Sequence, residues 1–101
     1  MTLQLVIHHP DHPAGSAAAA AERDALRDAA WEVADSHWAP SDEALLVSTD
    51  LSAEYLLAHF RAGLARRGHP APGMLLILPL GATAAWSGMP PDADAWLRAA
   101  L

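Results

Sequence analysis

The chain has 101 residues, no cysteine and a net charge of −6, with six basic residues against twelve Asp and Glu. The length fits one domain, and the lack of cysteine excludes disulfides, thiolate metal sites and thiol catalysis. The acidic charge argues against non-specific nucleic-acid binding, which needs a basic surface, and no apolar run approaches the roughly 18 residues of a membrane helix. Because no signal peptide is recognisable either, we expect a cytoplasmic protein without a membrane partner.

The first third of the chain predicts a strand followed by a helix. Apolar residues alternate with others over 2–8, the period-2 pattern of a pleated strand. A loop with two prolines and a glycine follows over 8–15. Ser16 is a suitable N-cap for a helix that we expect to run to about residue 36, because its polar and apolar positions separate at helical spacing.

The rest of the chain predicts three more strands and two helices. Residues 37–41 and 43–50 read as strands around a tight turn. A second helix, over about 52–67, has apolar residues at helical spacing and arginines in its last turn, where cations favour the helix dipole. Residues 73–80 form an apolar strand, and a short helix follows from Asp92.

This order, β-α-β-β-α-β with a C-terminal helix, is typical of the split βαβ, ferredoxin-like fold. We therefore predict one α+β ferredoxin-like domain over 1–101, with 82–101 as a C-terminal extension. The sheet order in that fold is 4-1-3-2, which places Pro40 and Pro79 on edge strands, where proline is tolerated. The alternative treats 37–43 as loop and gives a layered βαβαβα fold with parallel strands.

Alanine supplies 24 of the hydrophobic residues that make up 52% of the chain, so leucine is the main core residue. An alanine-rich first helix buries little apolar area per residue, and the predicted sheet has one face without helices. We therefore expect a homodimer, formed by strand 73–80 and the tail 86–101. Trp31, Trp86 and Trp96 are candidate interface residues. The alternatives are packing beside strand two for Trp31 and anchoring of the C-terminal helix to the sheet for the other two.

A cluster of histidines at the end of the first strand is the most chemical feature of the sequence. Residues 8–12 read His-His-Pro-Asp-His, and three imidazoles with a carboxylate suit Zn²⁺, Ni²⁺ or Cu²⁺. His8 and His9 point to opposite faces if the strand persists. We therefore name His9, Asp11 and His12 as the candidate ligands of a divalent transition metal, the alternative being a solvated polar loop.

Arg61, Arg66 and Arg67 form a small basic patch near the end of the second predicted helix. The patch suits contact with a phosphate group or a partner protein, and the alternative is a solvated helix end. The sequence contains neither a nucleotide-binding glycine motif nor a nucleophile elbow, so we assign no catalytic residue.

Two stretches carry a family resemblance. Residues 38–53 read Trp-Ala-Pro-Ser-Asp-Glu-Ala-Leu-Leu-Val-Ser-Thr-Asp-Leu-Ser-Ala, and the step Ala-Trp-Ser-Gly at 85–88 precedes the Ala-Trp-Leu of 95–97. With their spacing, these stretches resemble the small bacterial proteins described as SinR-like. The resemblance implies a ferredoxin-like fold similar to that of the small CRISPR adaptation nuclease subunit and of VapD-type ribonucleases. It also implies a frequent dimer, and it brings no settled activity with it.

The sequence departs from the nuclease relatives at the end of the first strand. Those relatives place Tyr-Asp there, and the carboxylate binds a divalent metal, whereas this chain has Ile7 followed by histidines, with Asp11 displaced between prolines. We therefore expect a non-enzymatic, homodimeric accessory or interaction module with a still unidentified protein partner. The alternative is a metal-dependent nuclease or a toxin-like ribonuclease, which only the likeness in fold supports.

Overall fold

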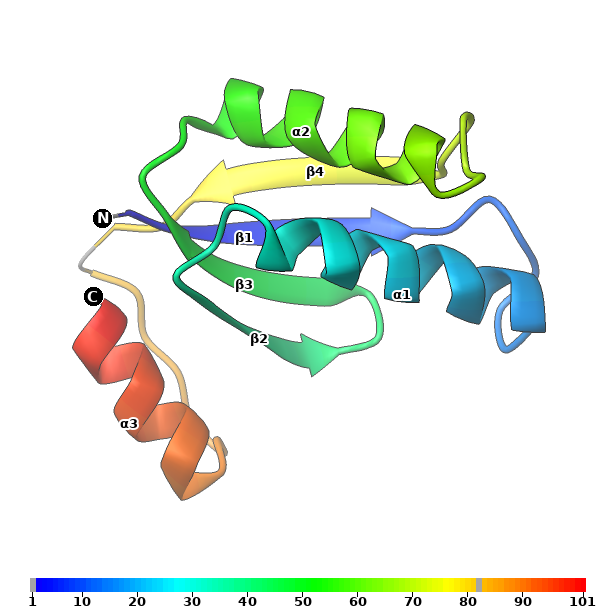
Figure 1. Ribbon diagram of the computed structural model, residues 1–101. Helices are drawn as coiled ribbons and strands as arrows, with labels where there is room; N and C mark the ends of the chain where they lie inside the picture. Colours follow the sequence, from blue (N-terminus) through cyan, green and yellow to red (C-terminus); the bar gives the residue numbers. More distant parts are fainter. Residues whose placement is uncertain (1, 82) are drawn as a thin grey trace.

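The protein has an α+β ferredoxin-like fold. A computed structural model describes residues 2–81 and 83–101. In chain order its elements are β1 (Thr2–His9), α1 (Ala17–Trp31), β2 (Ser36–Ser41), β3 (Ala44–Thr49), α2 (Ala53–Arg66), β4 (Met74–Pro79) and α3 (Pro91–Ala100). The strands form one antiparallel sheet in the order β2-β3-β1-β4, as predicted (Figure 1). Antiparallel pairing excludes the alternative with parallel strands.

Both strand prolines lie on the sheet edges, as their chemistry requires. Pro79 ends β4 opposite Gln4 of β1. Pro40 falls where the register between β2 and β3 shifts, between Trp38 and Ser41. Proline has no backbone N–H and so cannot donate a hydrogen bond to a neighbouring strand. On an edge strand this is tolerated, whereas a central strand would lose a hydrogen bond to one of its two neighbours.

Helices α1 and α2 lie side by side over one face of the sheet (Figure 1). The core on this face contains Val6, Leu45 and Val47 from the strands and Phe60 from α2, all buried. Alanines of α1 are buried in the same core, and a Cβ on Gly63 of α2 would lie 2.9 Å from the Cβ of an α1 alanine. The small residues of α1 therefore let the two helices pack closely.

The C-terminal helix α3 packs on the opposite face. Leu3 and Leu46 form a second core with Leu97 of α3. Leu45 and Val47, the strand neighbours of Leu46, face the first core. Trp86 and Trp96 pack against this second core. The expectation of a wholly bare sheet face was wrong, because the tail of the same chain covers part of it.

Helix α1 ends at Trp31, not near residue 36 as its polar spacing predicted. The backbone N–H of Asp35 donates to Ser48 O at 2.9 Å, and the Thr49 hydroxyl donates to Val33 O at 3.1 Å. These bonds to β3 draw the chain out of the helix and into the sheet. The start of the helix is as expected, since the Ser16 hydroxyl accepts from a backbone N–H of its first turn at 3.1 Å.

Within residues 2–81 and 83–101, no helix has both the length and the apolar character needed to cross a membrane.

Candidate metal-binding site

Helix α1 carries a buried carboxylate on the side that faces the end of β1. Glu22 is only 1% exposed and lies on the stripe of α1 that also buries Ala19 and Leu26. Removing a carboxylate from water costs several kcal/mol unless it is paired and hydrogen-bonded. The partners of Glu22 therefore determine what this part of the molecule can do.

Two hydrogen bonds reach one oxygen of Glu22. Nε2 of His8, a buried residue of β1, lies 2.5 Å from Oε2, and the backbone N–H of Gly73 donates to the same oxygen at 3.2 Å. Strand β1, helix α1 and the start of β4 thus meet at this carboxylate, and the other oxygen, Oε1, is left facing a different neighbour.

Burial lowers the pKa of His8, and the hydrogen bond to Glu22 offsets this only in part. The lowered pKa favours the neutral ring near pH 7, and Nε2 is the ring nitrogen that shares a hydrogen bond with the carboxyl group. Nδ1 of His8 is buried and has no hydrogen-bond partner in the described part of the chain. His8 therefore holds Glu22 in place through its hydrogen bond to Oε2.

Gly73 brings the start of β4 against the loop between β1 and α1. A Cβ at this position would lie 1.8 Å from the carbonyl oxygen of His9 and 2.6 Å from the backbone nitrogen of Asp11. Only glycine permits such an approach. The contact fixes the loop that carries His12 beside Glu22.

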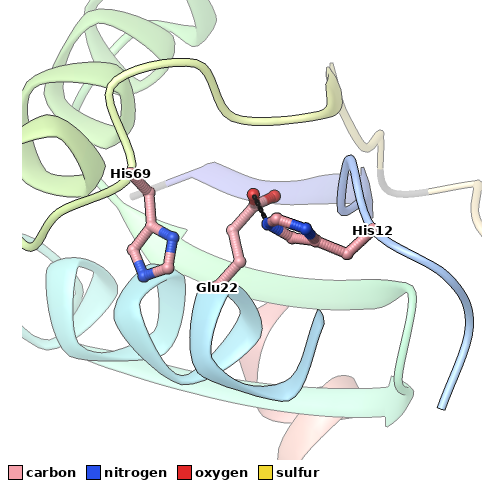
Figure 2. A group of neighbouring side chains, drawn as sticks. All are labelled: His12, Glu22 and His69. Carbon is pink, nitrogen blue, oxygen red and sulfur yellow. Dashed lines mark ion pairs between the residues drawn. The ribbon is translucent and has the colours of Figure 1, made fainter. Parts of the chain in front are cut away.

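Two further imidazoles flank the carboxylate. Nε2 of His12, in the β1–α1 loop, lies 3.8 Å from Oε1 of Glu22. Figure 2 shows His69, from the loop after α2, on the other side of Glu22. One ligand atom from each of these three residues lies within 4.8 Å of the other two. Two imidazole nitrogens and a carboxylate oxygen suit Zn²⁺ and its neighbours in the first transition row, whereas Mg²⁺ and Ca²⁺ prefer oxygen ligands.

This group shares only His12 with the ligands predicted from sequence. The exposed His9 side chain lies with its Nε2 3.4 Å from a Glu43 carboxylate oxygen, and Asp11 is exposed in the loop. Within the described residues, the group whose ligand atoms converge is His12, Glu22 and His69. It includes neither His9 nor Asp11, so binding of a metal by His9, Asp11 and His12 stays a prediction. Persistence of β1 through His9 turns that side chain away from Glu22.

Sequence reasoning missed two members of the group. The spacing of Glu22 could have indicated its role. It lies three residues after Ala19 and four before Leu26, on the apolar stripe of its helix, where a carboxylate is rarely found without a partner. His69 gave no such signal, because it follows α2 in a loop and reaches Glu22 only through the fold.

The arginine patch is divided in the structure. Arg66 and Arg67 lie within 3.4 and 2.7 Å of a Glu32 carboxylate oxygen and so link α2 to the end of α1. The hydrogen bond from Arg67 holds the pKa of Glu32 below its usual value. Arg61 is exposed beside a surface hollow that Leu57 also lines. Two of the three arginines therefore have a role in helix packing.

The tryptophans also have distinct surroundings. Trp31 is exposed and makes an edge-to-face contact with His37, the two ring centroids lying 4.2 Å apart. Nε1 of Trp96 donates to the Ser36 hydroxyl at 3.0 Å, and Nε1 of Trp86 donates to Asp94 at 2.8 Å. Trp86 and Trp96 thus hold α3 to the sheet of their own chain.

A strip of apolar side chains on β4 remains exposed. Leu75 and Ile77 pack against the core under the helices, so the alternate residues Met74, Leu76 and Leu78 face the side on which α3 packs. These three side chains, here termed the β4 strip, are 44–45% exposed. The strip lies on an edge strand, next to the part of the face that α3 covers.

The chain matches no protein-family model, and neither the curated proteins nor the solved structures contain a significant match to it.

Proposed function

We propose that the protein is a non-enzymatic interaction module that acts as a cytoplasmic homodimer through the β4 strip. The observation that carries this proposal is the exposure of Met74, Leu76 and Leu78 on one face of an edge strand. Large apolar side chains in a contiguous row mark a contact surface more often than a solvated one. The resemblance to SinR-like proteins supports the same conclusion, since it implies a dimer.

A second copy is the occupant we favour for the β4 strip. Paired around a twofold axis, two strips present the same apolar surface to each other, which satisfies the self-complementarity of such an interface. The strip is bordered by α3 on its own face, which limits how far another molecule can extend across the sheet. Each copy carries a net charge of −6, so the apolar contact must outweigh charge repulsion between the copies.

Light scattering on the purified chain at tens of micromolar tests this proposal. We expect the mass of a dimer for the unchanged chain and the mass of a monomer for Leu76→Glu, because a charge in the strip cannot be buried unpaired. Tyr55→Glu is the matched control: Tyr55 is 65% exposed on α2, away from the strip, and its variant should remain dimeric. A monomer for the unchanged chain, or a dimer for Leu76→Glu, contradicts the proposal.

The alternative of a metal-dependent nuclease receives less support. Such nucleases use Mg²⁺, which prefers oxygen ligands, whereas the converging group at the end of β1 is rich in imidazoles and Asp11 lies outside it. Incubation with RNA and DNA in Mg²⁺ or Mn²⁺ decides between the two. Cleavage that disappears in Asp11→Ala would favour the nuclease.

A further inference from the structure

We propose that His12, Glu22 and His69 bind one divalent transition-metal ion, with Zn²⁺ as the reference case. This site goes beyond the interaction function and lies on different residues from the β4 strip. The ligands come from three segments, namely the β1–α1 loop, helix α1 and the α2–β4 loop (Figure 2). A bound ion would therefore connect parts of the chain that are far apart in sequence.

The carboxylate is prepared for a metal on one side. Oε2 of Glu22 takes the hydrogen bonds from His8 and Gly73, and Oε1 faces His12 at 3.8 Å. Within the described residues, the side chains within 4 Å of the Glu22 carboxylate oxygens that could pair with its charge are the imidazoles of His8 and His12, not a guanidinium. A divalent cation at Oε1 would give this buried carboxylate a positively charged partner.

The distances require only a small closure. Zn²⁺ takes imidazole nitrogen and carboxylate oxygen at about 2.0–2.2 Å, which places neighbouring ligand atoms of a tetrahedral site about 3.3 Å apart. The three ligand atoms lie within 4.8 Å of one another. His12 and His69 are on loops, whereas Glu22 is on a helix. A movement of the loops by about 1–1.5 Å toward Glu22 would complete the coordination.

His8 acts in this site as a positioning residue and not as a ligand. Its Nε2 is engaged with Oε2 of Glu22 and its ring is buried under α1. A partner that orients a ligand in this way is the usual second layer of a metal site. Three protein ligands leave a fourth position for water or another small donor.

Isothermal titration calorimetry of tag-free protein with ZnCl₂ tests the site. We expect the unchanged chain to bind one Zn²⁺ ion. The His69→Ala variant should lose more affinity for Zn²⁺ than the roughly 10–100-fold that removal of an outer-layer partner typically costs. The Glu22→Gln variant should lose as much affinity as His69→Ala. His9→Ala is the matched control, because His9 is a neighbouring histidine outside the group, and it should bind like the unchanged chain. Excess Mg²⁺ should leave the titration unchanged.

His69→Ala carries the test if the buried Glu22→Gln variant fails to fold, because His69 lies on a loop and its circular dichroism spectrum can be compared directly with that of the unchanged chain. Zn²⁺ should also raise the melting temperature of the unchanged chain and of His9→Ala. It should not change the melting temperature of His69→Ala. Absence of Zn²⁺ binding overturns the proposal, as does binding that survives His69→Ala or is lost in His9→Ala. The monomeric Leu76→Glu variant should bind Zn²⁺ normally, so failure of the dimer and failure of the metal site are distinguishable.

Discussion

Replacing Gly73 with alanine tests the contact on which the arrangement around Glu22 depends. The added Cβ would lie 1.8 Å from the carbonyl oxygen of His9 and 2.7 Å from the carbonyl carbon of Pro10. Both are backbone atoms, so a side-chain rotation cannot relieve the clash and the loop or the start of β4 must move. Gly73 does not have a positive φ, so steric overlap, not backbone conformation, is the cause.

The expected loss of stability has two parts. Forcing an extra methyl group into a packed site costs about 1–3 kcal/mol. The movement also breaks the hydrogen bond from Gly73 N to Glu22, and a lost bond to a buried charged group costs about 1.5–3 kcal/mol. We expect the free energy of unfolding to fall by about 2.5–6 kcal/mol, a large fraction of the stability of a small domain.

Urea denaturation followed by circular dichroism measures this free energy. Gly81→Ala is the matched control, because it also lacks a positive φ and its added Cβ would meet Thr83 Oγ1 at an ordinary 3.9 Å. It should be neutral or stabilising by about 0.4–1 kcal/mol through the unfolded chain. A Gly73→Ala protein within about 1 kcal/mol of Gly81→Ala would refute the close packing of loop and strand.

Three other predictions concern the core, the pH dependence and the dimer. Phe60→Ala should lower the free energy of unfolding in urea by about 3–5 kcal/mol, because Phe60 is fully buried; a loss below about 1 kcal/mol would contradict this packing. Burial, followed by the charge of Arg27, lowers the pKa of His37 from its ordinary 6.5, so the unfolded chain takes up this proton first as pH falls. The stability that a neutral His37 contributes is complete when the pH is above 6.5, the ordinary pKa of histidine, and is lost as the pH falls below it. His37→Gln should therefore lose less melting temperature than the unchanged chain between about pH 8 and pH 5.5, and equal losses would refute the assignment. Added NaCl should tighten the dimer in sedimentation experiments, because it screens repulsion between two acidic copies; a weaker dimer in salt would indicate an interface held by ion pairs instead.

Local patterns in the sequence determined most of the fold. Alternation of apolar residues predicted β1, and Ser16 marked the start of α1 because its hydroxyl can accept from the first turn. The order of strands and helices, with Pro40 and Pro79 restricted to edges, was enough to predict the sheet order. These features depend on neighbours along the chain, which is why they can be read without the structure.

The tertiary structure decided what depends on distant partners. Helix α1 ends early because the backbone N–H of Asp35 donates a hydrogen bond to β3, and no pattern in the neighbouring residues predicts that hydrogen bond. The tail covers part of the sheet because Trp96 and Leu97 find partners on β1, β2 and β3. Both findings concern contacts between segments far apart in the sequence.

The group of His12, Glu22 and His69 shows most clearly which features the sequence determined and which depended on the tertiary structure. The row of histidines after β1 predicted metal ligands at the end of the sheet where the structure brings His12, Glu22 and His69 together, but two members of this group lie outside that row. A strand sends successive side chains to opposite faces, so adjacent histidines are separated in space. Folding instead brings His12 of one loop and His69 of another to Glu22 on the buried face of α1. The sequence alone determined that imidazoles gather near the end of β1, and the tertiary structure determined which side chains converge, because their convergence depends on how α1 and the two loops pack.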